Sequence, residues 1–376
     1  MKRILILTAD YGYGHRSAAN AIAEALHETY GQECAVEIVN PMDDPRAPAF
    51  FKDNQNDYDK MVTAMPELYK LGYQVSESRL AAGLINSTWV LMLFDVLREI
   101  IRQRKPDAIV CTYLFYQGIL SAVFAIEKRH IPLLTVVTDL GTVQSLWFHP
   151  VANLCLVPTK TVFDLAIDAG LAPEKVKITG IPVHPELTKG NQDQDSLRHS
   201  LGWRPDLFTV LAVGSKRVEH LYDALRVLNH SGLPLQLVVV AGGDDALYRL
   251  LQNTEWHVET CCYNYVTEMG TFMRAADCIL SKAGGLIVSE SLACGLPLIL
   301  VDVIPGQETG NAKHVLNGDA GVLTQDPIGV LETMCHWLEN DRRHYRQVAQ
   351  NARQLGHPRA AYDVADLVWA AASAST

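Results

Sequence analysis

The chain lacks an excess of positive charge and a long uninterrupted apolar run. Its 376 residues include 32 Lys and Arg against 42 Asp and Glu, a net charge of −10, which argues against a nucleic-acid-binding protein because such proteins are usually basic. The longest mainly apolar stretch, residues 80–97, is broken by three consecutive polar residues and by Asp95, so we expect no transmembrane helix. Only residues 4–7 are apolar between the basic start and Thr8, too few for a secretory signal.

Spacings typical of metal sites are missing as well. The 8 cysteines form no C-x-x-C pair and no zinc-like pattern with histidine, which favours reduced thiols in a cytoplasmic protein. Two D-x-D sequences, at residues 57–59 and 193–195, do not follow apolar strands, so we interpret them as solvated loop charges. The sequence therefore predicts no metal site.

A regular alternation of apolar runs and helical patterns predicts an α/β protein. In the first half, apolar runs typical of buried parallel strands cover residues 2–8, 35–40, 108–112, 133–138 and 154–158. Helical spacing covers residues 16–30, 87–104, 116–129 and 160–169. In the second half, strands are predicted over residues 208–213, 235–241, 257–262, 278–281 and 298–301, again with helices between them. This order is typical of doubly wound parallel sheets.

A polar, turn-rich stretch after residue 181 interrupts the alternation. We therefore predict a first domain over residues 1–185, a linker over 186–205 and a second domain over 206–355. A C-terminal helix over 356–376 is expected to pack back on the first domain. Two Rossmann-like domains of this kind would face each other across a cleft, where ligands bind at the carboxyl ends of the strands.

The first candidate site follows the first strand. Gly12 and Gly14 there allow a ligand to approach the backbone, and His15 lies at the start of the next helix, where free amides favour anions. An imidazole in this place is suited to act as a general base near neutral pH. The alternative is a histidine that makes only local hydrogen bonds.

The second candidate site is a glycine pair between a predicted strand and a helix. Gly284 and Gly285 leave amides at the helix start open to a pyrophosphate, and Glu290 in that helix is placed to accept hydrogen bonds from ribose hydroxyls. The alternative is an ordinary turn with a solvated Glu290. The loop after the next strand offers amide and carboxylate groups suited to sugar hydroxyls, at Gln307, Glu308 and Asn311.

Two further features of the first half have both a functional and a structural interpretation. Asp139 ends an apolar strand, and Trp147 with His149 offers a stacking ring and a polar group. Residues 88–105 are apolar at first and basic at the end, a pattern that fits a helix lying at a membrane surface. It fits equally a core helix whose basic last turn is favoured by the helix dipole.

Taken together, these motifs resemble the inverting UDP-sugar glycosyltransferases that include plant monogalactosyldiacylglycerol synthases and bacterial processive diacylglycerol glucosyltransferases. The resemblance covers nearly the whole chain. The matched segments are residues 12–16 (G-G-G-H-R in the family), 138–149 (T-D-L…W-F-H), 176–185 (I-x-V-x-G-x-P-V-R-P), 266–269 (V-T-K-M), 277–284 (D-C-I-I-T-K-A-G) and 295–311 (G-L-P-I-I-L…I-P-G-Q-E-K-G-N).

The resemblance implies a GT-B fold with the donor in the second domain and the acceptor in the first. His15 would take the proton from the acceptor hydroxyl, and Gly12, Gly14, Asp139, Trp147 and His149 would line the acceptor side. The UDP-sugar would be bound by Gly214, Ser215, Val266, Met269, Lys282, Ala283, Gly284, Gly285, Glu290, Gln307, Glu308, Asn311 and His184. Of these, Val266 and Met269 would flank the uracil, and the turn at residues 282–285 would face the diphosphate. No metal or other cofactor would be obligatory.

The chain departs from the family pattern in four places. Tyr13 replaces a glycine in the first motif, and His184 replaces an arginine. The strand end at residues 213–216 has fewer glycines, and Gly285-Leu-Ile replaces Pro-Gly-Thr.

The expected activity is transfer of galactose or glucose from a UDP-sugar to diacylglycerol, giving a β-glycosyldiacylglycerol. The expected partners are therefore a UDP-sugar, diacylglycerol and a membrane surface contacted by the first domain, with no nucleic acid. The expected location is peripheral, at the cytoplasmic face of a membrane and in part in the cytoplasm. The alternatives are another lipid or soluble acceptor, a UDP-N-acetylglucosamine 2-epimerase-like isomerase, and a UDP-sugar sensor without turnover.

Overall fold

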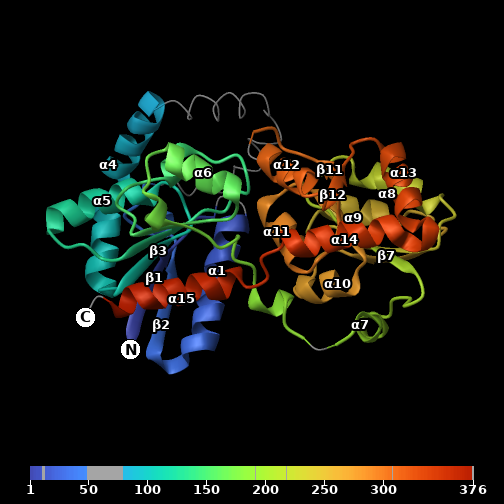
Figure 1. Ribbon diagram of the computed structural model, residues 1–376, viewed down its shortest axis with the longest axis horizontal. Coiled ribbons are helices and arrows are strands. Elements are labelled where there is room, and N and C mark those ends of the chain that lie inside the picture. The colour runs from blue at the N-terminus through green and yellow to red at the C-terminus, as the bar shows by residue number, and fades with distance from the viewer. Residues whose placement is uncertain (11–12, 49–78, 191, 217, 307, 375–376) are drawn as a thin grey trace. The chain divides into compact units, whose positions relative to one another are not determined.

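Two sheets of parallel strands organise the chain, each with helices on both faces (Figure 1). The computed structural model describes residues 1–10, 13–48, 79–190, 192–216, 218–306 and 308–374. Within these ranges, only the backbone is described for residue 13 and for residues 79–88. Unit 1 consists of Met1–Pro185, Pro305–Gln307 and Arg359–Thr376, and unit 2 of Glu186–Ile304 and Glu308–Pro358. The prediction of two doubly wound α/β sheets is confirmed.

Among its described residues, unit 1 has a sheet of six strands in the order β2-β1-β3-β4-β5-β6. They are β1 (Lys2–Leu7), β2 (Cys34–Val39), β3 (Ala108–Cys111), β4 (Leu133–Val136), β5 (Leu154–Val157) and β6 (Val176–Ile178). The helices are α1 (Tyr13–Tyr30), α4 (Arg79–Arg104), α5 (Tyr116–Glu127), α6 (Lys160–Asp168) and α15 (Ala360–Ser373). Successive side chains of a strand point to opposite faces. Ile4 and Ile6 therefore pack with α1 and α15, whereas Leu5 and Leu7 pack with α4 and α5.

Helix α15 returns the end of the chain to unit 1, where it packs on α1. The rings of Tyr30 and Trp369 are stacked with centroids 4.3 Å apart. The Tyr30 hydroxyl donates to Asp366 at 2.7 Å, and the Tyr362 hydroxyl donates to Glu28 at 2.6 Å. These contacts close one face of the unit 1 sheet.

In the part of unit 2 that the structure describes, the sheet also has six strands, in the order β12-β11-β10-β7-β8-β9. They are β7 (Phe208–Val213), β8 (Leu235–Val240), β9 (Glu259–Tyr263), β10 (Cys278–Lys282), β11 (Leu298–Asp302) and β12 (Gly321–Leu323). The helices are α7 (Gln194–Leu201), α8 (Leu221–Asn229), α9 (Asp245–Gln252), α10 (Met269–Ala275), α11 (Gly285–Ala293), α12 (Thr309–Asn317), α13 (Pro327–Leu338) and α14 (Arg343–Leu355).

The stretch expected as a linker, residues 186–205, belongs to unit 2 and contains α7. Asp193 is solvent-exposed, as expected, and it also caps this helix by accepting from the Ser196 amide at 2.9 Å. Arg198 on α7 forms a buried ion pair with Asp277 at 2.7 Å. This ion pair fixes α7 on unit 2. The polar sequence of residues 186–205 does not by itself indicate that this stretch packs on the second domain.

Candidate functional site

Threonines end the central strands of the unit 1 sheet and surround His15. Thr8 follows β1 and Thr112 follows β3, and the Thr112 hydroxyl donates to the Thr8 hydroxyl at 2.9 Å. Thr138 follows β4, and its Oγ1 lies 2.9 Å from Nδ1 of His15, in the first turn of α1. The carboxyl ends of neighbouring parallel strands thus hold the imidazole in one orientation. The sequence signal for Thr138 is its place beside Asp139 in the T-D-L motif.

The His15 imidazole is neutral at physiological pH because it is buried. The residue is only 9% exposed, and its ring meets Tyr113 edge-on, with centroids 5.1 Å apart. Burial lowers the pKa of His15 to about 4, and a hydrogen bond with the Thr112 backbone opposes this shift. A neutral imidazole has a nitrogen lone pair, so it is able to accept a proton.

The other residues expected on the acceptor side differ in their exposure. Trp147 is 1% exposed and lies behind His15, with ring centroids 6.1 Å apart, so it packs in the core and offers no open stacking face. Asp139 and His149 are partly exposed, and His149 Nδ1 accepts from the Val151 amide at 3.2 Å. A Cβ on Gly14 would meet no described atom within 4 Å. Gly12 lies outside the described residues.

An ion pair beside His15 was not singled out from the sequence. Asp10 follows β1, and Arg16 on α1 donates to both of its oxygens at 2.8 Å. Asn40, which follows β2, donates to the same carboxylate at 3.2 Å. Arg16 lowers the pKa of Asp10. The pair ties the loop between β1 and α1 to the helix that carries His15.

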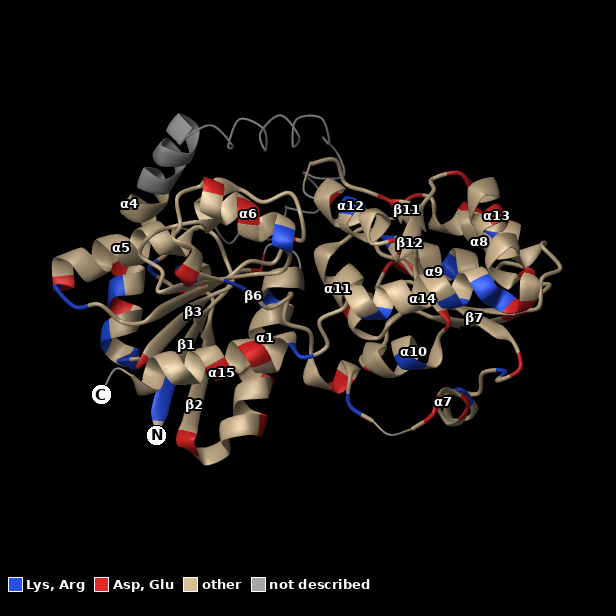
Figure 2. Cartoon of the chain, viewed as in Figure 1, with Lys and Arg blue, Asp and Glu red and all other residues tan. Residues whose placement is uncertain are grey.

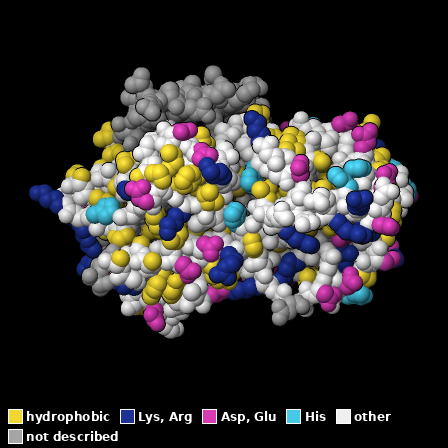
Figure 3. Space-filling view, viewed as in Figure 1, with side chains coloured by type: hydrophobic (Ala, Val, Ile, Leu, Met, Phe, Trp, Pro, Cys, Tyr) yellow, Lys and Arg dark blue, Asp and Glu magenta, His cyan; other side chains and the backbone are white. Residues whose placement is uncertain are grey.

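Helix α4 presents exposed apolar side chains at its middle and arginines paired with carboxylates at its end. Leu91 is 85% and Met92 41% exposed. At the other end, Arg98 and Arg102 both bind Glu127 of α5, and Arg104 binds Glu37 of β2. Basic and acidic residues are interspersed over both units (Figure 2). On the visible face, hydrophobic side chains are mixed with charged ones (Figure 3).

None of the helices in the described part of the chain meets the length and hydropathy needed to span a membrane.

In unit 2, the glycine turn lies between β10 and α11. The Ala283 amide donates to the Asp302 carbonyl at 2.9 Å, and Gly284 is the N-cap of α11. No side chain caps this helix, so the amides of its first turn, which begins at Gly285, are not satisfied by a cap. A Cβ on Gly284 would lie 3.0 Å from the Lys282 amine. The turn is therefore a place where an anion could bind to backbone amides.

Two residues expected to bind sugar hydroxyls make contacts that hold the glycine turn. Glu308 is buried, forms an ion pair with Lys282 and accepts from the Ile304 amide at 2.9 Å. Asn311 is buried and donates to the Ala283 carbonyl at 3.0 Å. Both fix the loop after β11 and the start of α12 against the turn. Gln307 lies outside the described residues.

Glu290 is placed on α11, in the second turn after the glycine pair. Burial raises its pKa to about 8. Within the described residues, its carboxyl group makes no hydrogen bond or ion pair. Glu290 is consequently protonated at neutral pH in the absence of a ligand.

The remaining predicted donor residues lie at several places in the chain. Gly214 follows β7. A Cβ at this position would lie 2.6 Å from the Leu247 side chain, so close packing explains why the residue is a glycine. Ser215 is partly exposed in the same loop. Val266 and Met269 are partly exposed at the start of α10. His184 is partly exposed and belongs to unit 1.

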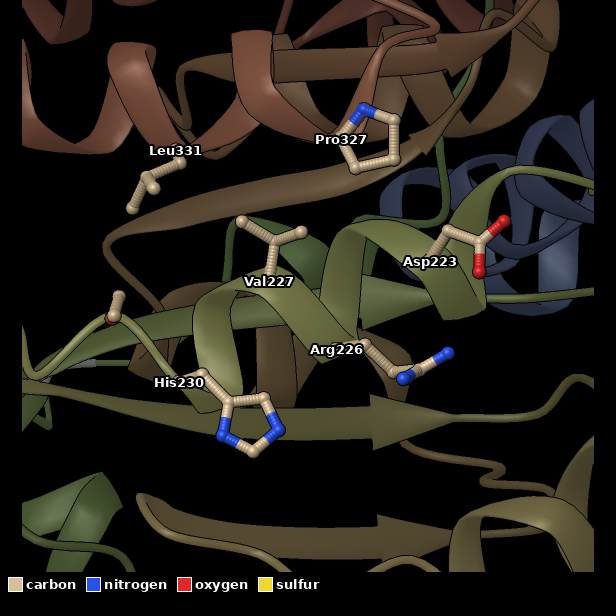
Figure 4. Close-up of a pocket in the computed structure, with 7 residues that line it drawn as sticks. Asp223, Arg226, Val227, His230, Pro327 and Leu331 are labelled. Atoms are coloured by element: carbon tan, nitrogen blue, oxygen red, sulfur yellow. The ribbon is translucent and has the colours of Figure 1, made fainter.

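A cavity of about 490 Å³ in unit 2 lies away from these residues (Figure 4). It is lined by residues of α8 and α13 and of the turn after α8, namely Asp223, Arg226, Val227, His230, Ser231, Pro327 and Leu331. No predicted site residue lines it. In the chain as far as it is described, no three His, Cys, Asp or Glu side chains gather as ligands for a metal ion.

Two models of known protein families match separate parts of the chain. Residues 15–183 match the family model "Monogalactosyldiacylglycerol (MGDG) synthase", and residues 193–355 match "Glycosyl transferases group 1". The chain is 30% identical to probable monogalactosyldiacylglycerol synthase 2, chloroplastic, of Oryza sativa subsp. japonica, over 96% of this chain and 79% of the rice protein.

Solved structures with low sequence identity share the fold. The MurG structure from Acinetobacter baumannii has a TM-score of 0.63 at 18% identity, covering 98% of this chain and 100% of MurG. The UDP-GlcNAc 2-epimerase of Neisseria meningitidis, bound to UDP-GlcNAc, also has a TM-score of 0.63, at 12% identity and with the same coverage. The fold is GT-B, as predicted.

Proposed function

The chain belongs to the monogalactosyldiacylglycerol synthase family, and on this premise we propose that it transfers a hexose from a UDP-sugar to diacylglycerol. The transfer inverts the anomeric configuration and gives a β-glycosyldiacylglycerol. The observation that carries the proposal is the match to this family across both units, with His15 buried and neutral at the predicted base position. The 2-epimerase likeness is one of fold alone, so it does not support the isomerase alternative.

In unit 1, the proposal assigns proton removal to His15. If Nδ1 carries the ring proton and donates to Thr138 Oγ1, Nε2 keeps its lone pair. Nε2 then accepts the proton of the acceptor hydroxyl as that oxygen bonds to the anomeric carbon and the bond to UDP breaks. Asp139 is assigned to the acceptor side because it is partly exposed after the carboxyl end of β4. His149 is also partly exposed, and its assignment rests on the family motif alone.

In unit 2, the proposal assigns UDP-sugar binding to the glycine turn and the elements beside it. The unsatisfied amides at the start of α11 take the diphosphate, whose negative charge grows as the sugar leaves. Glu290, protonated when no nucleotide is bound, loses its proton on binding and accepts from the ribose hydroxyls as a carboxylate. Val266 and Met269 flank the uracil, and Lys282, held by Glu308, faces the diphosphate.

Membrane contact is proposed for the apolar part of α4. Leu91 and Met92 are exposed, whereas the arginines farther along the helix are already paired with carboxylates. Contact would thus depend on apolar insertion more than on anionic lipid. The Leu91→Gln/Met92→Gln variant should bind diacylglycerol-containing vesicles more weakly in flotation assays. Ile126→Gln, at an exposed position on α5, is the matched control.

The direct test is UDP release by the purified chain on diacylglycerol micelles, with UDP-galactose, UDP-glucose and UDP-N-acetylglucosamine assayed in parallel. Release that requires diacylglycerol and occurs with UDP-galactose or UDP-glucose supports the proposal and identifies the sugar. Equal release without diacylglycerol would contradict the acceptor assignment. Conversion of the UDP-sugar without UDP release would favour an isomerase.

A further inference from the structure

One carboxylate, that of Asp302, gathers three donors from the segment after β7. Its Oδ2 accepts from the backbone amides of Glu219 at 2.9 Å and His220 at 3.1 Å. Its Oδ1 pairs with Nδ1 of His220. The Asp302 side chain is 12% exposed and the His220 side chain 40%, so solvent screens the ion pair from the histidine side.

The same residue also holds the glycine turn. Asp302 is the last residue of β11, and its backbone carbonyl accepts from the Ala283 amide at 2.9 Å. In the sheet, β10 lies between β7 and β11. The described residues after β7, 214–216 and 218–220, therefore lead from β7 past the end of β10, where the turn begins, to Asp302.

We propose that Asp302 and His220 form a clasp that holds the loop after β7 over the end of β10 and thereby positions it for the diphosphate of UDP. The inference rests on the proposed UDP-sugar function of unit 2 and adds two positioning residues to it. The loop brings the exposed Lys216 and the backbone of Ser215 with it. Without the clasp, these groups would have to be ordered each time a nucleotide binds.

The clasp depends on pH in a defined direction. Asp302 raises the pKa of His220 through hydrogen bonding and charge; nearby Glu219 and Asp223 act in the same direction, and burial opposes them. The ion pair is present below this raised pKa. As pH rises through it, His220 loses its charge and the clasp weakens, so the contribution of His220 to UDP affinity should fall with rising pH.

The test is calorimetric titration of UDP into the purified full chain, with no acceptor present. His220→Ala should weaken UDP binding roughly tenfold, the usual effect of losing a hydrogen bond to a charged group. His220→Asn places an amide donor near the position of Nδ1, so it should recover most of the affinity but lose the part of the pH dependence that the wild-type chain owes to His220. His230→Gln, at the other end of α8 in the cavity of Figure 4, is the matched control and should bind UDP like wild type.

Hydrogen exchange gives a second measurement that needs no nucleotide. The amides of Glu219 and His220 should be protected in the wild-type chain and exchange faster in Asp302→Ala. Unchanged UDP affinity in His220→Ala would overturn the clasp. Absence of UDP binding by the wild-type chain would overturn the donor site and the clasp with it. Binding with the predicted variant effects, but without glycolipid formation, would refute the acceptor proposal and leave the clasp supported.

Discussion

Replacing His15 by alanine tests whether its imidazole removes the proton from the acceptor hydroxyl. The side chain is buried, and Thr138 fixes the orientation of its ring. Loss of a general base typically slows a reaction by about 10²–10⁴, which corresponds to about 3–5 kcal/mol of barrier. We therefore expect kcat to fall by that factor, while the affinity for UDP, whose proposed binding site is in unit 2, stays the same.

The pH profile tests whether His15 is buried and neutral in the working enzyme. The pKa of His15 is lowered to about 4, so its imidazole is already neutral across pH 6–8. Protonation of His15 should therefore not limit kcat at saturating UDP-sugar in this range. An ordinary histidine, with a pKa near 6.5, would make kcat rise through that pH.

The assay is initial-rate UDP release on diacylglycerol micelles, with the product lipid quantified at each pH. His27→Ala, at an exposed position in the last turn of the same helix, is the control and should retain full activity. Near-full activity of His15→Ala would refute the base assignment. The account of burial would be refuted if the kcat of the wild type rose with an apparent pKa near 6.5 and the kcat of His15→Ala did not.

Three further predictions concern other parts of the chain. UDP binding near pH 7 should release a proton from Glu290, because ribose hydroxyls that donate to its carboxylate lower a pKa of about 8; calorimetry in buffers of different ionisation enthalpy measures the release, and Glu290→Gln should abolish it. Gly14→Ala should leave Tm unchanged but reduce transfer, since the added methyl meets no described atom yet occupies space near His15; a large loss of Tm would contradict this. Asp277→Asn should lower the free energy of unfolding by about 3 kcal/mol in denaturant titrations, because it leaves the buried Arg198 without its counter-charge, and an unchanged midpoint would show that the pair contributes little.

The central strands of both sheets were predictable because they are buried on both faces and read as short apolar runs. Two edge strands, β6 and β12, were missed. Each has three residues, and parts of both are exposed, so neither gives an apolar run. Helix α7 was missed for a similar reason: its pattern is polar, and its position depends on the Arg198–Asp277 ion pair.

The residue types at the candidate site were predictable, but their pairings were not. The sequence indicates a glycine turn and a polar loop after the next strand, yet it does not show that Glu308 is paired with Lys282. Likewise, Asp302 and His220 are far apart in the chain and belong to no shared motif. Such pairs form only when the parallel strands bring their carboxyl ends together.

The most direct test of the central claim is the identity of the lipid formed from diacylglycerol and UDP-galactose or UDP-glucose. Mass spectrometry of the extracted lipid, with proton NMR of its anomeric position, distinguishes the outcomes. The account predicts a monohexosyldiacylglycerol with a β-linked sugar, formed by wild type and nearly absent with His15→Ala. An α-linked product would contradict inversion, and the absence of any glycosylated diacylglycerol would contradict the proposed transfer itself.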